Sequence, residues 1–526
     1  MDFTVVDLSR LQFAATAMYH FLFVPLTLGL SFLMAIMESV YVMSGREIWR
    51  RMTLFWGTLF GINFAMGVAT GIVMEFQFGM NWSYYSHYVG DIFGAPLAIE
   101  GLMAFFLEAT FIGIFFFGWD RLSKVGHLTV TWLVAIGANF SALWILIANG
   151  WMQNPVGSTF NPDTMRMEIT DFMEVIFNPV AQAKFVHTVS AGYVTGAMFI
   201  MSISAWFLLR GRHIDLAKRS MAVAASFGLA SALSVVVLGD ESGYVATEHQ
   251  KMKIAAMEGM WETEPAPAGL TVFAVPGVRE NTYEVKVPYV LGLITTRSLS
   301  TEVPGILPLV EHAESRIRNG MIASAALDQI RADGSNAQAR QIFADTWHDL
   351  GYALLLKRYT NDVATATNEQ VAQAAWDTVP DVPSLFWSFR FMVAIGIYLI
   401  VFFATAFVLA SKHKLGNSRV LLWIALYSLP LPWIAIELGW LVAEYGRQPW
   451  VVEGVLPTFY AASGLTFMDL AISLGFFLTL YTALAIVMVF LMVKLIKAGP
   501  SDGNVLIDGI GGPAMIPNGA AAAPDR

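Results

Sequence analysis

The chain has 526 residues, of which 56% are hydrophobic and only 13% are charged, and its formal net charge is −9. Soluble domains carry about 25% charged residues, so the composition excludes an ordinary soluble domain and predicts an all-α, polytopic membrane protein. Cysteine is absent, which excludes disulfides, cysteine-ligated iron–sulfur clusters and covalent haem attachment through C-x-x-C-H. There is no Gly-rich phosphate-binding motif, so ATP-driven transport by this chain is not expected.

Nine apolar runs are long enough to cross a bilayer as helices. The polar first residues lead directly into the first run, so no cleavable signal peptide is expected. Six runs fall in an N-terminal membrane part (1–239) and three in a C-terminal membrane part (384–498). We expect the helices near residues 11–42, 53–79, 95–118, 128–150, 184–209, 219–239, 384–410, 419–444 and 465–494.

Lys and Arg in the connecting loops predict the orientation in the membrane. The odd-numbered loops and the segment after the ninth helix carry basic residues, such as Arg46, Arg50 and Lys412, whereas the second loop has none. The N-terminus is therefore expected outside, on the periplasmic side, and the C-terminus in the cytoplasm. The negative charge lies mostly in one outer loop, so it gives no reason to expect a nucleic-acid partner.

That loop, residues 240–383, has the size of a domain and is expected on the outer side. It contains helix-like segments at 310–332 and 336–356. A loop of this length is usually functional or disordered, and its apolar content favours partial order. Residues 499–526 are rich in Gly, Pro and Ala, and we expect a disordered tail.

The stretch from Pro430 to Trp450 begins as an apolar helix that contains Glu437 and Glu444, and Arg447 follows one helical turn after Glu444. A carboxylate in hydrocarbon is costly, so it usually has a function or a partner. Two interpretations stand about equal for this stretch alone: a functional carboxylate, or a Glu444–Arg447 ion pair that anchors a helix end.

Of the nine histidines, only His20 and His187 fall inside predicted spans. Two are too few for a bis-His pair of haems or for a haem–copper centre. If the chain binds haem, Met and carboxylate side chains must contribute, and His/Met is a known axial pair. Met392 is a candidate on the outer side, although most of the 26 methionines fill apolar gaps.

Other polar residues fall in the same outer half of the membrane part. Glu100 and Glu108 are eight residues apart on one expected helix, hence on a similar face. Ser141 lies in the middle of the fourth helix, where a backbone hydrogen bond is the ordinary alternative. Arg390 suits either a haem propionate or a lipid phosphate. Glu38, near the inner end of the first helix, is expected to snorkel or to pair with Arg46 or Arg50.

Five stretches together resemble the large subunit of cytochrome bd quinol oxidases, in the branch with a long quinol-binding loop. They are SRLQFAATAMYHFLFVPLTLG, GAPLAIEGLMAFFLE, SALWILIANGWMQNP, KFVHTVSAGYVTGAMF and GWLVAEYGRQPW. The similarity covers nearly the whole chain and stops at the tail.

The resemblance implies three haems and no copper. His187 and Met392 would ligate a low-spin haem b. His20 and Glu444 would hold a high-spin haem b and a chlorin-type haem d, and which residue takes which haem stays open. The remaining residues that the resemblance assigns to the haem region are Glu100 at the high-spin pair, Arg390 and Arg447 near the haems, and Trp440 in electron transfer.

The resemblance also implies a route for each substrate. Glu108 and Ser141 match a proton route, and Lys253 and Glu258 match quinol-binding residues of the outer loop. The implied enzyme oxidises quinol outside, reduces dioxygen to water with protons from the cytoplasm, and separates charge without pumping. Its implied partners are a second large membrane subunit, a small single-span subunit and the lipid of the bacterial inner membrane.

Two other functions compete with this one. A proton-coupled secondary transporter would use the carboxylates to carry protons, but it predicts a midplane site and often internal repeats, and the sequence shows neither. A haem-binding structural subunit without catalysis would not require both His20 and Glu444. Colour distinguishes an oxidase from the transporter, and oxygen uptake distinguishes it from the structural subunit.

Overall fold

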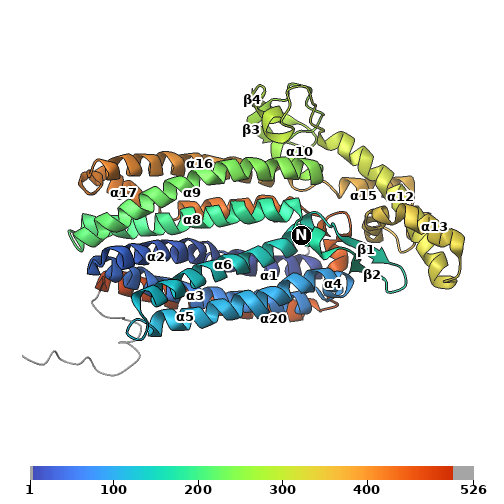
Figure 1. Ribbon diagram of the computed structural model, residues 1–526. Helices are drawn as coiled ribbons and strands as arrows, with labels where there is room; N and C mark the ends of the chain where they lie inside the picture. Colours follow the sequence, from blue (N-terminus) through green and yellow to red (C-terminus); the bar gives the residue numbers. More distant parts are fainter. Residues whose placement is uncertain (1–3, 501–526) are drawn as a thin grey trace, which may run out of the picture.

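The computed structural model describes residues 4–500. Within these residues, nine helical segments are long and apolar enough to cross a membrane, as the sequence predicts. They lie side by side in one bundle (Figure 1). Their parts are α1 (Val5–His20), α2 (Val24–Ser44), α3 (Glu47–Met80), α4 (Ser83–Ile99), η1 (Glu100–Phe105), α5 (Phe106–Phe117), α6 (Lys124–Gln153), α7 (Phe172–Ile176), α8 (Pro179–Leu209), α9 (Ile214–His249), α16 (Val382–Ser411), α17 (Arg419–Tyr427), α18 (Leu431–Trp440), η6 (Leu441–Tyr445) and α20 (Phe467–Ala498).

Prolines divide two segments that the sequence predicts as single helices. The expected helix over 11–42 is broken between α1 and α2, because Pro25 cannot donate a backbone N–H to the carbonyl of Phe21. The break leaves His20 as the last residue of α1. Likewise Pro430 and Pro432 separate α17 from α18 within the expected helix over 419–444.

Two wider helical turns occur in the bundle, and each carries a predicted site residue. The π-helix η1 begins at Glu100, four residues after Pro96 in α4. The π-helix η6 contains Glu444. Such π-turns inside α-helices are frequent at functional sites, because the extra residue turns a side chain away from its regular face.

Small residues let the two central helices approach closely. A Cβ added at Gly29 of α2 would lie 2.7 Å from the Cα of Gly196 in α8. This small-residue contact is the usual way in which membrane helices gain van der Waals contact without a hydrophobic driving force. Large apolar side chains such as Trp56, Phe60 and Phe403 are fully buried around it.

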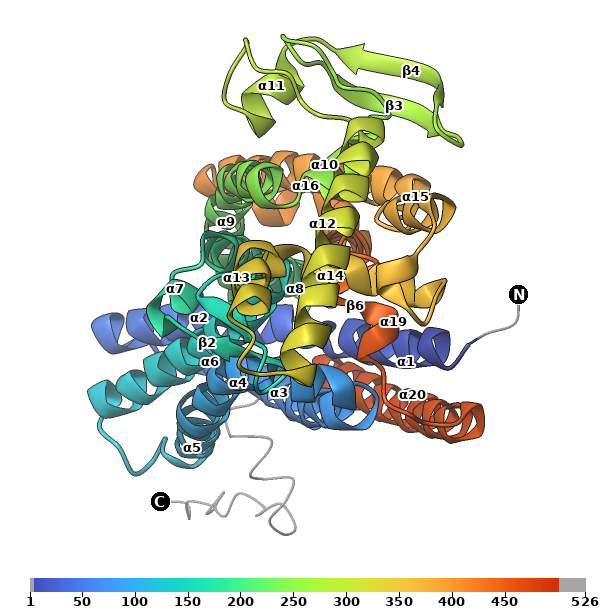
Figure 2. The same ribbon diagram turned by 90° about the vertical axis from the view of Figure 1, so that its right-hand side faces the viewer.

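Residues 250–381 form a compact unit at one end of the bundle, which we call the loop domain, and that end is the loop end (Figures 1 and 2). The sequence predicts that the sixth helix stops at 239, but α9 continues ten residues further, to His249. The loop domain comprises α10 (Lys251–Glu258), β3 (Leu270–Pro276), β4 (Asn281–Val287), α11 (Val290–Thr295), α12 (Ile306–Ala332), α13 (Ala337–Thr346), η2 (Trp347–Asp349), α14 (Leu350–Leu354), η3 (Leu355–Arg358), η4 (Val363–Thr365) and α15 (Asn368–Trp376).

The expected helical segments 310–332 and 336–356 correspond to α12 and to α13 with its shorter successors. One apolar cluster joins this part to the bundle: Phe343 of α13 packs beside Phe160, with their ring centroids 5.7 Å apart. The loop domain is therefore seated on the membrane helices through a shared core.

Short elements complete the connections. The three sheets in the described residues are two-stranded antiparallel hairpins. The first and third hairpins are β1 (Ser158–Asn161) with β2 (Arg166–Ile169), and β5 (Trp450–Val452) with β6 (Leu456–Pro457); η5 (Leu415–Asn417) and α19 (Thr458–Ala461) are the remaining short helices. The tail expected at 499–526 falls almost wholly outside the described residues.

Candidate functional site

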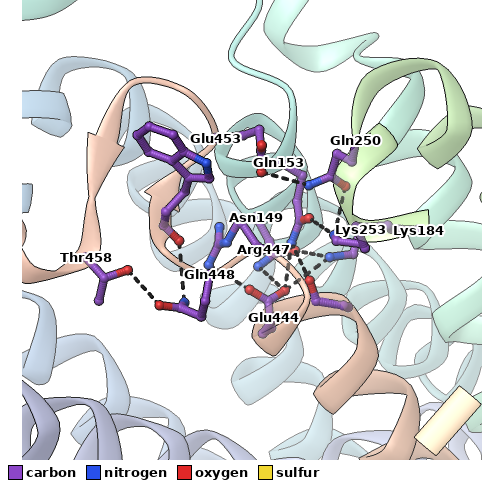
Figure 3. A network of polar contacts seen from close by, with 12 residues as sticks. Asn149, Gln153, Lys184, Gln250, Lys253, Glu444, Arg447, Gln448, Glu453 and Thr458 are labelled. Carbon is purple, nitrogen blue, oxygen red and sulfur yellow. Dashed lines mark hydrogen bonds and ion pairs between the residues drawn. The ribbon is translucent and has the colours of Figure 1, made fainter. Parts of the chain in front are cut away.

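The carboxylate of Glu444 is the centre of a polar network at the loop end of the bundle (Figure 3). Its Oε1 accepts hydrogen bonds from Asn149 Nδ2 at 3.1 Å and Gln153 Nε2 at 3.0 Å, both on α6. Lys184 Nζ lies 3.2 Å from the same oxygen, and Arg447 Nη2 lies 2.7 Å from Oε2. The Glu444–Arg447 pair therefore exists, but it is one part of a larger site that compensates the carboxylate with two cations.

Sequence reasoning missed Lys184. It stands one turn before His187 on α8, and its ammonium also contacts Asn149 and lies 5.3 Å from the ring centroid of Trp440. The sequence contains a signal for it: Lys184 is the first residue of the expected helix 184–209, on the outer side, where the loop charges predict few basic residues. Asn149 and Gln153 both donate to the same carboxylate oxygen of Glu444.

Lys253 belongs to the Glu444 network. Lys253 is 8% exposed. Its ammonium donates to Gln153 Oε1 at 2.5 Å and to Gln250 Oε1 at 2.8 Å. Gln250 in turn donates to Glu453 Oε2 at 3.3 Å. Burial and the nearby ammonium of Lys184 lower the pKa of Lys253 to about 7, and burial raises the pKa of Glu453.

Glu258 faces a different partner from Lys253. Its carboxylate lies 2.7 Å from Arg390 Nη2, and the same guanidinium donates to the Met257 carbonyl at 2.5 Å and contacts the Thr271 carbonyl. Burial raises the pKa of Glu258, although the arginine opposes that shift. The two predicted quinol residues thus lie on different sides of α10: one contacts the Glu444 network and the other is fixed to α16.

The ring of His20 presents one free nitrogen. Its Nδ1 lies 2.8 Å from Thr70 Oγ1, and the single hydroxyl proton of Thr70 is donated to the Met66 carbonyl at 2.9 Å. Thr70 therefore accepts from Nδ1–H, which leaves the lone pair of Nε2 available. A histidine whose other ring nitrogen is held in this way is typical of metal ligands.

Each predicted histidine or methionine ligand is next to a glycine of a neighbouring helix. A Cβ at Gly71 of α3 would lie 3.1 Å from His20 Cε1. A Cβ at Gly239 of α9 would lie 3.1 Å from His187 Cε1, and one at Gly439 of α18 would lie 3.1 Å from Met392 Sδ. These glycines leave room for the ligand side chains where any other residue would press against them.

Glu100 and Ser141 are in direct contact. Ser141 Oγ donates to Glu100 Oε1 at 2.5 Å, so the serine does not make the backbone bond that is its ordinary alternative. Glu108 is buried on α5 and lies against Gly137 of α6, whose added Cβ would be 3.5 Å from the Glu108 Cα. Its Oε1 is buried without a hydrogen-bond partner among residues 4–500. The three residues thus lie along the interface that η1 and α5 form with α6.

The prediction for Glu38 is wrong. Its carboxylate pairs with His127 Nδ1 at 2.6 Å and accepts from Thr131 Oγ1 at 2.5 Å, whereas Arg50 pairs with Glu47. His127, which lies outside the predicted spans, is only 2% exposed. The charged loop residues do not reach Glu38, because α6 packs beside α2 and brings its own polar side chains.

Comparison with known proteins supports one family across the chain. The family model described as cytochrome bd terminal oxidase subunit I matches residues 8–500. The chain belongs to this family. It is 54% identical to cytochrome bd-II ubiquinol oxidase subunit 1 of Escherichia coli, over 94% of this chain and 97% of that protein. It is 38% identical to cytochrome bd ubiquinol oxidase subunit 1 of Bacillus subtilis, over 94% of each.

A solved structure agrees with the fold. The structure of the bd oxidase from Geobacillus thermodenitrificans aligns with a TM-score of 0.76 at 25% identity, over 94% of this chain and 99% of that one. As a cytochrome bd terminal oxidase subunit I, the chain is a multi-pass membrane oxidoreductase of a haem-containing, multi-subunit complex.

The residues present fit haem. His20 offers a free Nε2, and His187 Nδ1 is buried without a hydrogen-bond partner in the described part of the chain. Within the same residues, Nε and Nη1 of Arg447 are buried donors without acceptors. Buried donors of this kind require an anionic group, and a haem propionate supplies one.

Proposed function

We propose that the chain is the haem-bearing catalytic subunit of a quinol:oxygen oxidoreductase that oxidises quinol at the outer side and reduces dioxygen to water. The observation that carries the proposal is the local surroundings of four residues in a chain whose family is established: His20, His187 and Met392 each lie against a glycine of a neighbouring helix, and Glu444 is held by Gln153 and Arg447. The relatives named ubiquinol oxidases support quinol as the substrate class.

The haems, two of type b and one of type d in this proposal, supply electron transfer and the reduction of oxygen when bound. His187 and Met392 would hold the low-spin haem b. His20 and Glu444 would hold the other two. The ring centroid of Trp440 lies 5.3 Å from Lys184 Nζ and 4.9 Å from the ring centroid of Phe21. In this proposal Trp440 takes part in electron transfer.

The chain's own residues prepare the site. Thr70 fixes the tautomer of His20, and the two cations beside Glu444 compensate the charge of that carboxylate. The donors of Arg447 that have no acceptor in the described residues would hold a haem propionate, and Arg390 fixes Glu258 at the base of the loop domain. Lys253 and Glu258 bind the quinol from the two sides of α10.

Glu108, Glu100 and Ser141 carry the protons for oxygen reduction from the cytoplasmic side. Quinol releases its protons outside, so charge separates across the membrane without a pump. The complex contains a second large membrane subunit and a small single-span one, lies in the bacterial inner membrane, and has the N-terminus of this chain outside.

A reduced-minus-oxidised visible spectrum of the purified complex, with quinol as reductant, tests the proposal. We expect b-type bands together with a separate red chlorin band, and oxygen uptake on addition of quinol. His187→Ala should remove only the low-spin signal. A colourless complex would exclude the haem assignment, and a b-type spectrum without the chlorin band would exclude haem d.

A further inference from the structure

The hairpin of β3 and β4 in the loop domain exposes an apolar face. Val285 and Val287 are two residues apart on β4, so they point to one side, and Phe273 of β3 lies opposite Val285 on that same side. Phe273, Val285 and Val287 are 43%, 53% and 40% exposed. Neighbouring apolar side chains that stay exposed mark a surface that meets another protein or a membrane.

The other face of the hairpin is polar and belongs to the loop domain. Thr271 lies opposite Lys286 on this side and is 2% exposed. Lys286 Nζ lies 2.7 Å from Glu264 Oε2 and 3.4 Å from Glu284 Oε2. The hairpin is therefore amphipathic, with its charges paired on one face and its apolar side chains on the opposite face.

The hairpin lies outside the cross-section of the helix bundle. Figure 2, which looks onto the loop end, shows β3 and β4 beyond α10 and α16, and Figure 1 shows them beside the loop-end part of α9 and α16. Strand β3 connects the hairpin to α16: the ring centroid of Phe273 lies 5.5 Å from that of Trp387, and the Thr271 carbonyl accepts from Arg390 Nε at 3.2 Å.

These contacts determine the depth of the hairpin. Helix α16 has 30 residues and is about 45 Å long at 1.5 Å per residue, which matches a bilayer with its headgroup layers. A hydrocarbon core of about 30 Å centred on the helix begins about 8 Å from its loop end. Trp387 and Arg390 lie about 8 Å and 12 Å from that end. The base of the hairpin is therefore level with the boundary between headgroups and hydrocarbon.

The apolar face continues into the outward surface of a membrane span. The ring centroid of Trp387 lies 5.7 Å from that of Phe391, and Phe391, Ile397 and Val401 are 55–61% exposed along α16. Tyr289, directly after β4, is 53% exposed. Tyr and Trp beside an apolar surface are typical of the membrane interface, so the side chains around the hairpin fit the depth that its contacts give.

We propose that the β3–β4 hairpin lies in the headgroup layer of the membrane at the loop end, with Phe273, Val285 and Val287 against lipid acyl chains. Lipid fits because the face lies at the level where α16 itself enters hydrocarbon. The unpaired strand edges need water or headgroups, so the hairpin lies at the interface and does not insert more deeply. Arg390 also pairs with Glu258, so the lipid contact steadies α10 as well. The inference adds a membrane contact and does not depend on the proposed function.

The test places a spin label on two neighbouring residues of β4 that point to opposite faces. The chain has no cysteine, so Val285→Cys and Glu284→Cys each give it a single thiol for a nitroxide. The complete complex is reconstituted in vesicles of phosphatidylethanolamine and phosphatidylglycerol. Collisions of the nitroxide with oxygen, which concentrates in lipid, are compared with collisions with water-soluble nickel ethylenediaminediacetate. Wild-type complex treated with the same label gives the background from other subunits.

The ratio of oxygen to nickel collisions should be several-fold higher for the label at 285 than for the label at 284. Equal ratios at the two positions would overturn the proposal. A label at 285 that is shielded from both reagents would overturn it too, because another subunit or a second copy of the chain would then cover the face.

A second position and a charge on the apolar face give an independent check. A label at Val287→Cys should report lipid as the label at 285 does. Adding Val285→Asp should move the 287 label toward water and lower its ratio several-fold, whereas adding Glu284→Gln on the opposite face should not. Size-exclusion chromatography of each variant confirms the intact complex. A 287 label that stays in lipid beside Val285→Asp would refute the proposal, because the apolar face would then not determine where the hairpin lies.

Discussion

Gly239→Ala adds one methyl group beside His187 and nothing else. The new Cβ would lie 3.1 Å from His187 Cε1 and 3.4 Å from Nδ1. Carbon atoms pack best at about 3.5–4.0 Å, so the ring must retreat by roughly half an ångström. Ligand sites work only when their side chains are held within about 0.5 Å, so this displacement is at the limit of what a haem ligand tolerates.

Overpacking of this kind destabilises the packed arrangement around the ligand side chain by about 1–3 kcal/mol. Because about 1.4 kcal/mol corresponds to a tenfold change in an equilibrium constant, haem affinity at His187 should fall by about fivefold to a hundredfold. The matched variant is Gly71→Ala, whose Cβ meets His20 Cε1 at the same 3.1 Å and should weaken a different haem.

The assay is the haem content and the reduced-minus-oxidised spectrum of each purified complex. Gly243→Ala is the control, because it lies one turn further along α9 and its Cβ would meet nothing within 4 Å. Gly239→Ala should lose the low-spin signal selectively, and Gly243→Ala should retain the wild-type spectrum. Equal spectra for these two variants, or an equal loss at both histidines, would refute the reasoning.

Three other predictions concern the loop end and the interface that η1 and α5 form with α6. Arg390→Met leaves the carboxylate of Glu258 buried without its cation, which should cost about 3–5 kcal/mol; thermal unfolding should show a larger loss than for the Arg390→Met, Glu258→Gln double variant, and equal losses would contradict a buried pair. Burial lowers the pKa of Lys253 to about 7, so its ammonium loses a proton as pH rises through that value. The KM for quinol should therefore rise over this interval in the wild type and stay flat for Lys253→Arg, whereas a pH-independent wild-type KM would exclude a role for that charge. Ser141→Ala removes a hydrogen bond to Glu100 worth about 1.5–3 kcal/mol, so oxygen uptake should slow while the haem spectrum stays unchanged; unchanged uptake would remove Ser141 from the proton route.

The sequence by itself determined the class and the spans. Hydrocarbon admits no unpaired backbone groups, so apolar runs of sufficient length must be helices; nine were predicted, and residues 4–500 contain nine. The sequence also predicts how deep each polar residue lies in the membrane, because each residue of an α-helix advances a fixed distance along the helix axis. For that reason His20, His187, Glu100 and Glu444 could be chosen as candidate site residues before any contact was known.

Only the tertiary structure decided which polar groups meet. Glu38 pairs with His127 and not with the arginines nearest in sequence, and Glu444 gathers Lys184 and Gln153 from two other helices. The repeat of apolar residues along one helix shows which of its faces is buried, but not which neighbouring helix packs against each face. Partners are fixed when helices pack, through close glycine contacts and proline breaks that set position and rotation. The sequence therefore determined where the costly polar groups lie along each helix, and the packing of the helices decided how each of them is compensated.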